Sequence, residues 1–157
     1  MSLRASFVRM GLRAFVKSRA GPIPDLVASR KGYNAIKSWV PNPPRGTKVT
    51  KHEIGGLKAV RVATARSLPG RHMLYLHGGA YINGSPSHYR DFIWRIADVT
   101  STNVLCIDYR LAPEYPFPAA LDDAIAAYHW LLADGASPQR LAIMDMQVGD
   151  ARLRHGD

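Results

Sequence analysis

The sequence predicts an α/β protein built on a mostly parallel sheet that is flanked by helices. From residue 46 onward, short runs with the two-residue alternation of β-strands recur between turn residues. The later runs are separated by stretches with helical spacing of apolar residues, in the order strand, strand, strand, helix, strand, helix, strand. Strands linked through helices lie parallel in one sheet, and 157 residues suffice for one domain with a core.

Each element has its own local signal. Pro41 to Pro44 end a helical pattern, Gly55 and Gly56 form a hairpin turn, and Asp134 with Gly135 ends another helix. The expected helices cover residues 2–21, 23–40, 87–99 and the stretch from Pro116 to Asp134, and the expected strands cover residues 48–54, 57–63, 72–76, 103–109 and 140–144. The single cysteine, Cys106, falls inside the apolar run NVLCIDY and is expected to be a buried strand residue.

Positive charge is concentrated in the first half of the chain. Residues 1–72 carry 15 Lys and Arg against two acidic residues, whereas residues 73–157 carry 6 against 10. Such asymmetry is found in proteins that bind nucleic acid or anionic membranes. The basic residues are spaced singly, however, and no nucleic-acid motif, 18-residue apolar run or secretory signal is present. We therefore expect a cytoplasmic protein without nucleic-acid binding or stable membrane insertion, and a basic binding module in residues 1–40 is one further alternative.

The stretch LYLHGGAYING, residues 74–84, carries the first chemical signal. It places two glycines directly after a predicted strand, at the carboxyl end of the sheet where ligands of such folds gather. Without side chains, Gly78 and Gly79 let backbone N–H groups approach a ligand oxygen, and such donors stabilise the oxyanion that forms in acyl transfer. A plain glycine turn between a strand and a helix explains the same residues.

Two motifs carry a family resemblance. HGGAY, between LYL and NGSP, resembles the HGGG-type motif of α/β-hydrolase esterases and lipases, and DYRLAPEYPFPAALDDAIAAYHWL, residues 108–131, resembles the corresponding segment of hormone-sensitive-lipase-like (family IV) carboxylesterases. The resemblance spans about residues 3–143 and implies the N-terminal half of an α/β-hydrolase that acts on small acyl esters without cofactor or metal. It implies a helical cap or lid-like segment over residues 1–45, a partial core over 46–144 and an unrelated polar tail over 145–157.

The resemblance also assigns roles to residues. It implies that the backbone N–H groups of Gly79 and Ala80 form the oxyanion hole, with Gly78 shaping the loop. His77 orients the loop through hydrogen bonds and is not a base, and Tyr81 lines the mouth of the pocket. Further residues brace the neighbouring loops or suit the start of a helix, namely Asp108, Tyr109, Arg110, Glu114, Asp122 and Asp123.

The family's nucleophile is absent. A serine in a G-D-S-A-G elbow should follow the strand that begins at Arg140, but the chain reads MDMQVGDARLRHGD from Met144 and has no serine after Ser137. With Asp145 aligned to the family's aspartate, Met146 takes the place of the serine, and a thioether cannot attack a carbonyl. We therefore expect a truncated, inactive form. The alternative is a noncatalytic pseudoenzyme or fragment that binds acyl ligands or a partner chain, and the oligomeric state stays open.

Other residues could replace the missing serine only with suitable geometry. Ser85, Ser87 and His88 follow the glycine motif, but their spacing does not predict a hydrogen-bonded pair with an orienting carboxylate. His155 belongs to the polar tail and is expected to be a solvated side chain. The sequence thus predicts an oxyanion loop without a nucleophile.

Overall fold

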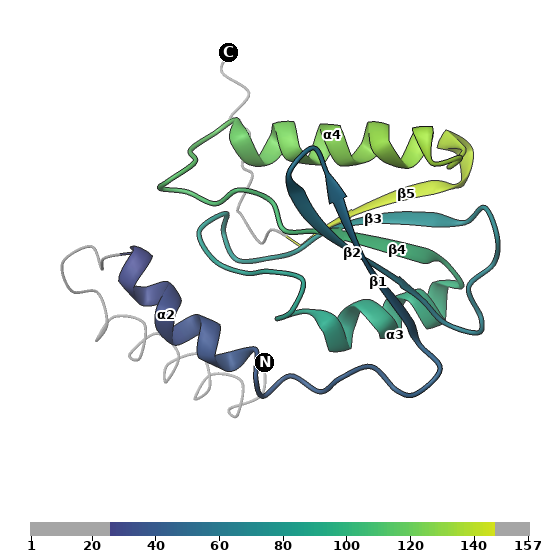
Figure 1. Ribbon diagram of the computed structural model, residues 1–157, viewed down its shortest axis with the longest axis horizontal. Helices are drawn as coiled ribbons and strands as arrows, with labels where there is room; N and C mark the ends of the chain where they lie inside the picture. Colours follow the sequence, from purple (N-terminus) through teal and green to yellow (C-terminus); the bar gives the residue numbers. More distant parts are fainter. Residues whose placement is uncertain (1–25, 147–157) are drawn as a thin grey trace, which may run out of the picture.

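The computed structural model describes residues 26–146, which form a five-stranded sheet between two helices (Figure 1). The strand order is β1-β2-β4-β3-β5. The elements, in chain order, are α2 (Leu26–Ile36), β1 (Lys48–Ile54), β2 (Leu57–Ala63), β3 (His72–Leu76), α3 (Arg90–Thr100), β4 (Asn103–Ile107), α4 (Ala119–Ala133), the 3-10 helix η1 (Pro138–Arg140) and β5 (Leu141–Asp145).

The sheet is mixed, with a parallel part and an antiparallel part. β4, β3 and β5 run parallel to one another, whereas β2 pairs antiparallel with both β1 and β4. The β1–β2 hairpin turns at Gly55 and Gly56, whose φ angles are 56° and 88°. Both angles lie in the left-handed region that a two-residue turn of type I′ requires, and glycine reaches it without a steric cost.

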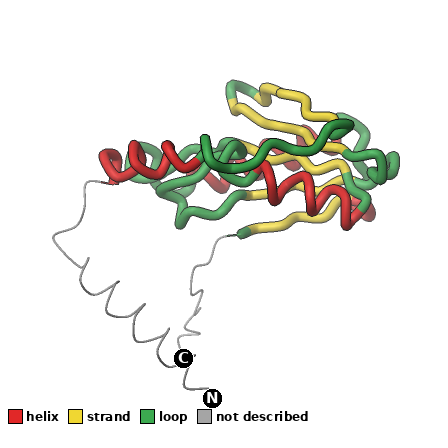
Figure 2. Tube along the Cα trace, turned by 90° about the horizontal axis from the view of Figure 1, so that it is seen from below, coloured by secondary structure: helices red, strands yellow, loops and turns green. Residues whose placement is uncertain are grey.

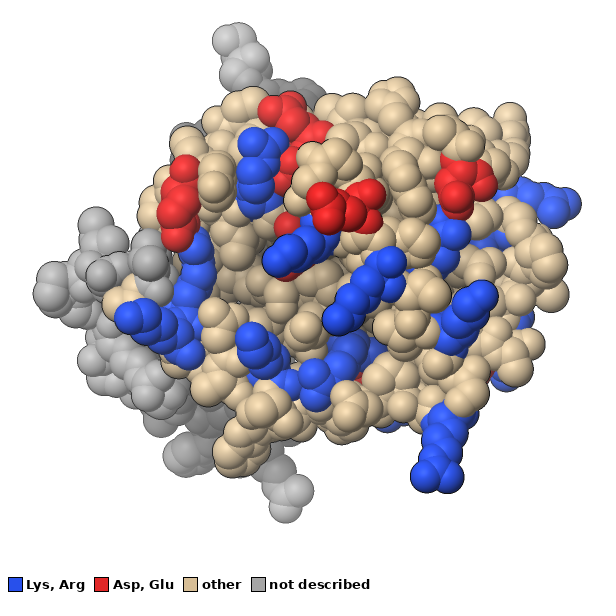
Figure 3. Space-filling view, viewed as in Figure 1, with Lys and Arg blue, Asp and Glu red and all other residues tan. Residues whose placement is uncertain are grey.

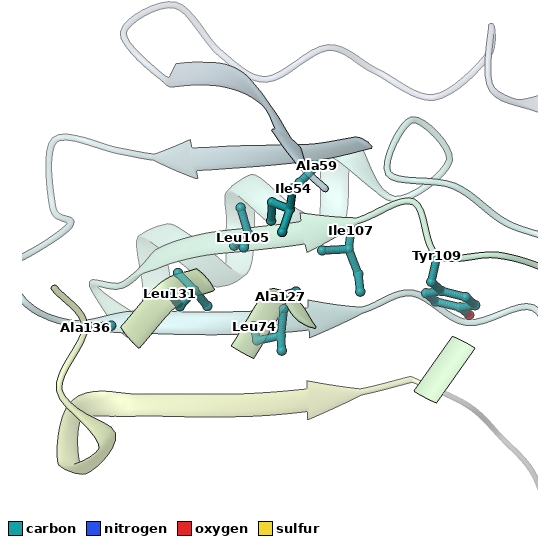
Figure 4. Packing of buried hydrophobic residues seen from close by; sticks show 9 residues of the cluster. All are labelled: Ile54, Ala59, Leu74, Leu105, Ile107, Tyr109, Ala127, Leu131 and Ala136. Carbon is teal, nitrogen blue, oxygen red and sulfur yellow. The ribbon is translucent and has the colours of Figure 1, made fainter. Parts of the chain in front are cut away.

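Helices cover both faces of the sheet (Figure 2). On one face, Ile93 and Ala97 of α3 pack against a buried cluster that includes Met73, Tyr75 and Cys106. On the other face, α4 packs with Ala127 and Leu131 against the remaining inward side chains (Figure 4), which include Ile54, Ala59, Leu74, Leu105 and Ile107. The predicted burial of Cys106 in a strand is confirmed, since none of its surface is exposed.

The predicted bounds agree with the structure for β1, β2 and β3 and differ elsewhere. α3 begins at Arg90, three residues later than predicted, because Ser85 and Pro86 accept hydrogen bonds in turns from the amides of His88 and Tyr89. β4 ends two residues before the predicted end, and β5 lies one residue later because η1 takes up Arg140.

The N-terminal elements also depart from the prediction. α2 ends at Ile36, four residues before the predicted end, because the amides of Ser38 and Trp39 donate in turns to Ala35 and Ile36. The predicted helix over residues 2–21, and the part of the polar tail after residue 146, lie outside the described residues.

Two surface properties bear on the charge and membrane predictions. On the face seen in Figure 3, Lys and Arg side chains are interspersed with uncharged residues, and the acidic side chains lie mostly toward the α4 side. Within residues 26–146, no helix is both long enough and apolar enough to cross a bilayer.

Candidate active site

The loop that follows β3 reverses direction through an unusual run of backbone conformations. The φ angles are 130° at Gly79, 54° at Ala80 and 60° at Tyr81. The Gly79 carbonyl accepts hydrogen bonds from the amides of Ile82 (3.1 Å) and Asn83 (3.0 Å), which closes a tight turn. A Cβ at Gly79 would lie 2.0 Å from the Asn83 carbonyl oxygen, so no other residue fits this position without movement of the backbone. The second glycine of the motif is therefore a steric requirement of the loop.

The flanking glycines bring the loop against its neighbours. A Cβ at Gly84 would lie 2.4 Å from Nδ1 of His77, and a Cβ at Gly78 would lie 2.8 Å from the Met146 carbonyl oxygen. The Met146 amide in turn donates to the Leu76 carbonyl (3.1 Å). Gly78 therefore lies directly beside Met146, the residue that the family resemblance predicted to stand in place of the nucleophile.

The backbone donors of this loop are available. Between residues 26 and 146, no acceptor takes a hydrogen bond from the amide of Gly79 or of Ala80. Backbone N–H groups are normally paired unless they face solvent or a ligand. These two adjacent amides are therefore open to solvent or to a ligand.

His77 lies at the centre of the loop and is fully buried. Its ring stacks against Tyr109, with 4.2 Å between ring centroids, and against Tyr89, at 5.9 Å. Nδ1 donates to the Gly78 carbonyl at 2.9 Å, and burial lowers the pKa of His77 to about 4. The imidazole is therefore neutral at physiological pH, and it contacts the loop rather than solvent.

The end of β4 supports the same loop. The Tyr109 hydroxyl donates to the His77 carbonyl at 2.6 Å, and the Ala112 amide donates to the Tyr81 carbonyl at 2.9 Å. Burial raises the pKa of Tyr109, so the hydroxyl stays protonated and can donate. The segment after β4 thus contacts the loop after β3 at two points, His77 and Tyr81.

An ion pair holds the segment after β4 in place. The Arg110 guanidinium contacts Asp123 of α4, with 2.8 Å between Nη2 and Oδ1, and the Arg110 amide donates to Oδ2 at 2.8 Å. Asp123 is buried, and its carboxylate is satisfied by these bonds. A structural role for Asp123 was predicted from the helix dipole, whereas the contact that the structure shows is with Arg110.

Arg30 joins α2 to the loop after β3 and to the segment after β4. Its Nε donates to the Ile82 carbonyl at 2.5 Å, its Nη1 contacts Oε1 of Glu114 at 2.6 Å, and its Nη2 donates to the Ala112 carbonyl. The hydrogen bond to Arg30 lowers the pKa of Glu114. Sequence reasoning missed Arg30, because no local pattern signals contacts with residues more than 50 positions away.

Ser85 and His88 form a hydrogen-bonded pair that their spacing did not predict. Ser85 Oγ lies 2.7 Å from Nδ1 of His88, and Nε2 of His88 lies 3.1 Å from the Tyr33 carbonyl oxygen. The Tyr33 and His88 rings also stack, with 4.6 Å between their centroids. The orienting group is a carbonyl of α2 and not a carboxylate, so the pair joins α2 to the loop. A prediction of a turn from Ser85 to His88, in place of the start of a helix, could have revealed this pair.

A cavity of about 440 Å³ opens beside the loop, at the carboxyl ends of β3 and β5. Tyr81 lies in its wall and is 46% exposed. The rest of the lining is mainly apolar or aromatic and includes Leu76, Tyr109, Tyr115, Leu121 and the polar residue Asp145. Among the described residues, no cluster of three or more His, Cys, Asp or Glu side chains is placed to bind a metal ion.

Comparisons with known proteins agree with this architecture. The profile of the α/β-hydrolase fold matches residues 73–149. An acetyl-hydrolase of Streptomyces hygroscopicus is 42% identical over 106 residues, which are 68% of this chain and 34% of that protein. An ethyl acetate hydrolase of Pseudomonas putida is 41% identical over 87 residues, which are 53% of this chain and 27% of that protein.

Solved structures extend the match to most of the chain. A hormone-sensitive lipase from a metagenome library has a TM-score of 0.73 and 36% identity, and the match covers 92% of this chain and 47% of that one. An esterase/lipase from an uncultured bacterium has a TM-score of 0.70 and 34% identity, with 87% and 46% covered. The chain therefore spans half or less of the length of these relatives. It belongs to the hormone-sensitive-lipase-like family of α/β-hydrolases.

Proposed function

We propose that residues 77–84 form the oxyanion-binding loop of a carboxylic ester hydrolase site. The observation that carries this proposal is the pair of available amides at Gly79 and Ala80, in a loop whose Gly78 lies beside the position of the family's nucleophile. Relatives named acetyl-hydrolase and ethyl acetate hydrolase support small acyl esters as the substrate class.

In this reaction a serine oxygen bonds to the ester carbonyl carbon, the serine proton passes to a histidine base, and the carbonyl oxygen becomes an oxyanion. The amides of Gly79 and Ala80 donate to that oxygen, and neutral His77 keeps the loop in place through the Gly78 carbonyl. The apolar part of the ester enters the cavity that Tyr81 lines. A single oxyanion donor is worth about 10²- to 10³-fold in rate, so two fixed donors are a substantial part of catalysis.

The 157-residue chain alone should not hydrolyse esters, because Met146 stands at the nucleophile position and no serine follows Ser137. The test is an assay of the purified chain with p-nitrophenyl acetate, with Ser85→Ala and Ser87→Ala compared side by side. We expect the background rate for all three proteins. Turnover that Ser85→Ala abolishes and Ser87→Ala retains would show that Ser85 and His88 act as a nucleophilic pair, contrary to this proposal.

A chimera tests the oxyanion assignment directly. It joins residues 1–144 to the part of the metagenomic hormone-sensitive lipase that follows the counterpart of Met144. We expect the chimera to hydrolyse p-nitrophenyl esters and Gly79→Ala to lower its kcat by about 10²-fold or more, because the new Cβ meets the Asn83 carbonyl and displaces both donors. Gly56→Ala is the matched control, since its φ is also positive but its surroundings are open. Equal kcat values for the two variants would refute the assignment.

The second candidate is a noncatalytic protein that binds acyl ligands. The cavity favours it, because an apolar site of about 440 Å³ is present in a chain that lacks the nucleophile. Thermal stabilisation of the 157-residue chain by butyrate esters, with no turnover, would support this candidate. It would be rejected if Leu121→Asp, a change in the cavity wall, left that stabilisation unaltered.

A further inference from the structure

The inner face of α2 is polar. Among the α2 side chains whose burial is described, Arg30 and Tyr33 are half-buried and the others are exposed. Positions three residues apart lie on the same side of a helix, so these two side chains share one face. Tyr33 stacks on His88, and Arg30 contacts the loop after β3 at Ile82. α2 therefore lies against this loop, to one side of the sheet (Figure 1).

Arg30 uses all three nitrogens of its guanidinium for contacts with other segments. Nε donates to the Ile82 carbonyl at 2.5 Å, and Nη2 donates to the Ala112 carbonyl. Nη1 contacts Oε1 of Glu114 at 2.6 Å, and the Arg30 side chain is 18% exposed. A guanidinium is planar, and its donors point in fixed directions. Arg30 therefore holds two main-chain segments at a fixed separation, one after β3 and one after β4.

Both residues whose carbonyls bind Arg30 use their own amides to bind the oxyanion loop. The Ile82 amide donates to the Gly79 carbonyl at 3.1 Å, and the Ala112 amide donates to the Tyr81 carbonyl at 2.9 Å. The carbonyls of Gly79 and Tyr81 belong to the peptide groups on either side of Ala80. Arg30 thus supports, through one intervening residue on each side, the part of the loop that contains Ala80.

The planarity of the peptide group transmits this support to the two oxyanion donors. A carbonyl and the N–H of the next residue belong to one rigid plane, and in a trans peptide they point in opposite directions. The Gly78 carbonyl, bound by Nδ1 of His77 at 2.9 Å, therefore sets the direction of the Gly79 N–H. In the same way the Gly79 carbonyl, bound by the Ile82 amide, sets the direction of the Ala80 N–H.

We propose that Arg30 is a positioning residue for the oxyanion loop and keeps the Ala80 N–H aimed at the substrate oxygen through Ile82 and Ala112. His77 does the same for the Gly79 N–H, so the two donors have separate supports. This inference rests on the proposed function, because it concerns the same pair of donors. Arg30 acts through other residues: it is not among the described residues that line the cavity, and its three nitrogens already have acceptors.

Two variants separate the geometry of Arg30 from its charge. Arg30→Lys keeps the positive charge, but a single ammonium nitrogen cannot reach all three acceptors of the guanidinium. Glu114→Gln removes the charge of the ion pair and leaves the bonds from Arg30 to the two carbonyls in place. The proposal therefore expects a larger effect from Arg30→Lys than from Glu114→Gln.

The first measurement is residue-resolved hydrogen exchange by NMR on the 157-residue chain, and it needs no activity. In Arg30→Lys the amides of Ile82 and Ala112 should exchange about 10-fold faster or more, because the turn that they close opens more often. The amides of β4, in the middle of the sheet, should keep the parent rate. Glu114→Gln should change the loop rates less, and Lys31→Ala should leave them unchanged. Lys31 is the matched control, because it is an exposed cation on the same helix.

The second measurement is the hydrolysis of p-nitrophenyl esters by the chimera described above. Arg30→Lys should lower kcat by about 10- to 100-fold, because misplacement of a catalytic group by about 1 Å can cost about 100-fold in rate. KM should stay within about threefold of the parent value, since the loss falls on an interaction made in the transition state. Lys31→Ala should retain the parent kcat, and Glu114→Gln should lie between the two.

The combined results uphold or overturn the proposal. Faster exchange throughout the sheet, or an unfolded Arg30→Lys chain, overturns it, because loss of a positioning residue leaves the core intact. Equal effects of Arg30→Lys and Glu114→Gln assign the role to the ion pair and overturn it as well. So does an active chimera in which Arg30→Lys and Lys31→Ala have the same kcat. An inactive parent chimera counts against the proposed function, and the exchange rates then decide whether Arg30 holds the loop.

Discussion

The strands β3 and β5 lie side by side in parallel register, from the His72–Leu141 pair to the Leu76–Asp145 pair, yet their carboxyl ends differ. The chain after β3 enters a dense network in which His77 is fully buried and Gly79 has no room for a side chain. In β5, by contrast, Ile143 is exposed, and Asp145 at the end of the strand lines the open cavity. The β3 end is held by contacts from α2, the segment after β4, its own turn and Met146, so the loop after β3 is fixed from several sides.

The largest expected effect comes from a substitution in the tightly packed loop after β3. Gly79→Ala should lower the free energy of unfolding by about 4 kcal/mol, because it adds backbone strain at a φ of 130° and a Cβ 2.0 Å from the Asn83 carbonyl oxygen. Gly56→Ala, with a φ of 88° and open surroundings, should cost only about 1 kcal/mol. Urea denaturation followed by circular dichroism measures both. Similar losses would mean that the loop tolerates movement and is not tightly closed.

The second largest effect should come from acid, which destabilises the loop after β3 through His77. Burial lowers the pKa of His77 to about 4 from 6.5, so the unfolded chain takes up this proton first as the pH falls. The stability that neutral His77 contributes is present above pH 6.5 and is lost as the pH falls toward 4, by about 3 kcal/mol in total.

The measurement is the free energy of unfolding at several pH values for the parent chain and two variants. His77→Gln should remove up to about 1.4 kcal/mol per pH unit from the slope between pH 6.5 and 4. His129→Gln, at an exposed position on α4, should keep the slope of the parent chain. An unchanged slope in His77→Gln would show that His77 does not titrate in this range.

A smaller effect is expected for the hydrogen bond that joins the segment after β4 to the loop after β3. Tyr109→Phe removes the buried hydroxyl that donates to the His77 carbonyl at 2.6 Å, and it should cost about 1–2 kcal/mol of unfolding free energy. Tyr115→Phe changes a half-exposed tyrosine of the cavity wall and should cost less than about 0.5 kcal/mol. If both variants unfold at the same urea concentration, the hydroxyl is not a support of the loop.

The smallest effect is expected in β5, where Ile143 is exposed. Ile143→Lys should change the stability of the isolated chain by less than about 0.5 kcal/mol, because the side chain is 58% exposed and packs little. Leu74→Ala, its fully buried partner in β3, should cost about 3 kcal/mol in the same assay. A large loss for Ile143→Lys would show that the isolated chain already covers this edge.

Local patterns predicted part of this structure well. The alternation in residues 48–63 and the glycine pair between the two strands gave β1 and β2 with their observed bounds, because a hairpin is specified by neighbouring residues. The motif LYLHGGAYING located the loop at the end of β3. The glycines of this motif indicate on their own that the loop has little room for side chains.

Long-range contacts could not be predicted in the same way. Arg30 is 52 positions from Ile82, and Asp123 is 13 positions from Arg110, so neither contact leaves a periodic signal in the sequence. The pair of Ser85 and His88 depended on a turn that ends just before α3, and the helix was predicted to begin inside that turn. The family resemblance supplied the roles of the loop residues, and those roles await the experiments above.

Cys106 is a natural chemical probe at the centre of the sheet. It is the chain's single cysteine, it lies fully buried in β4 between β2 and β3, and burial raises the pKa of its thiol well above the usual value. A thiol reagent such as dithionitrobenzoate can react only when the centre of the sheet opens, because the thiolate is the reactive form. The labelling rate in native buffer therefore measures the opening of the core in every variant, without an added tag.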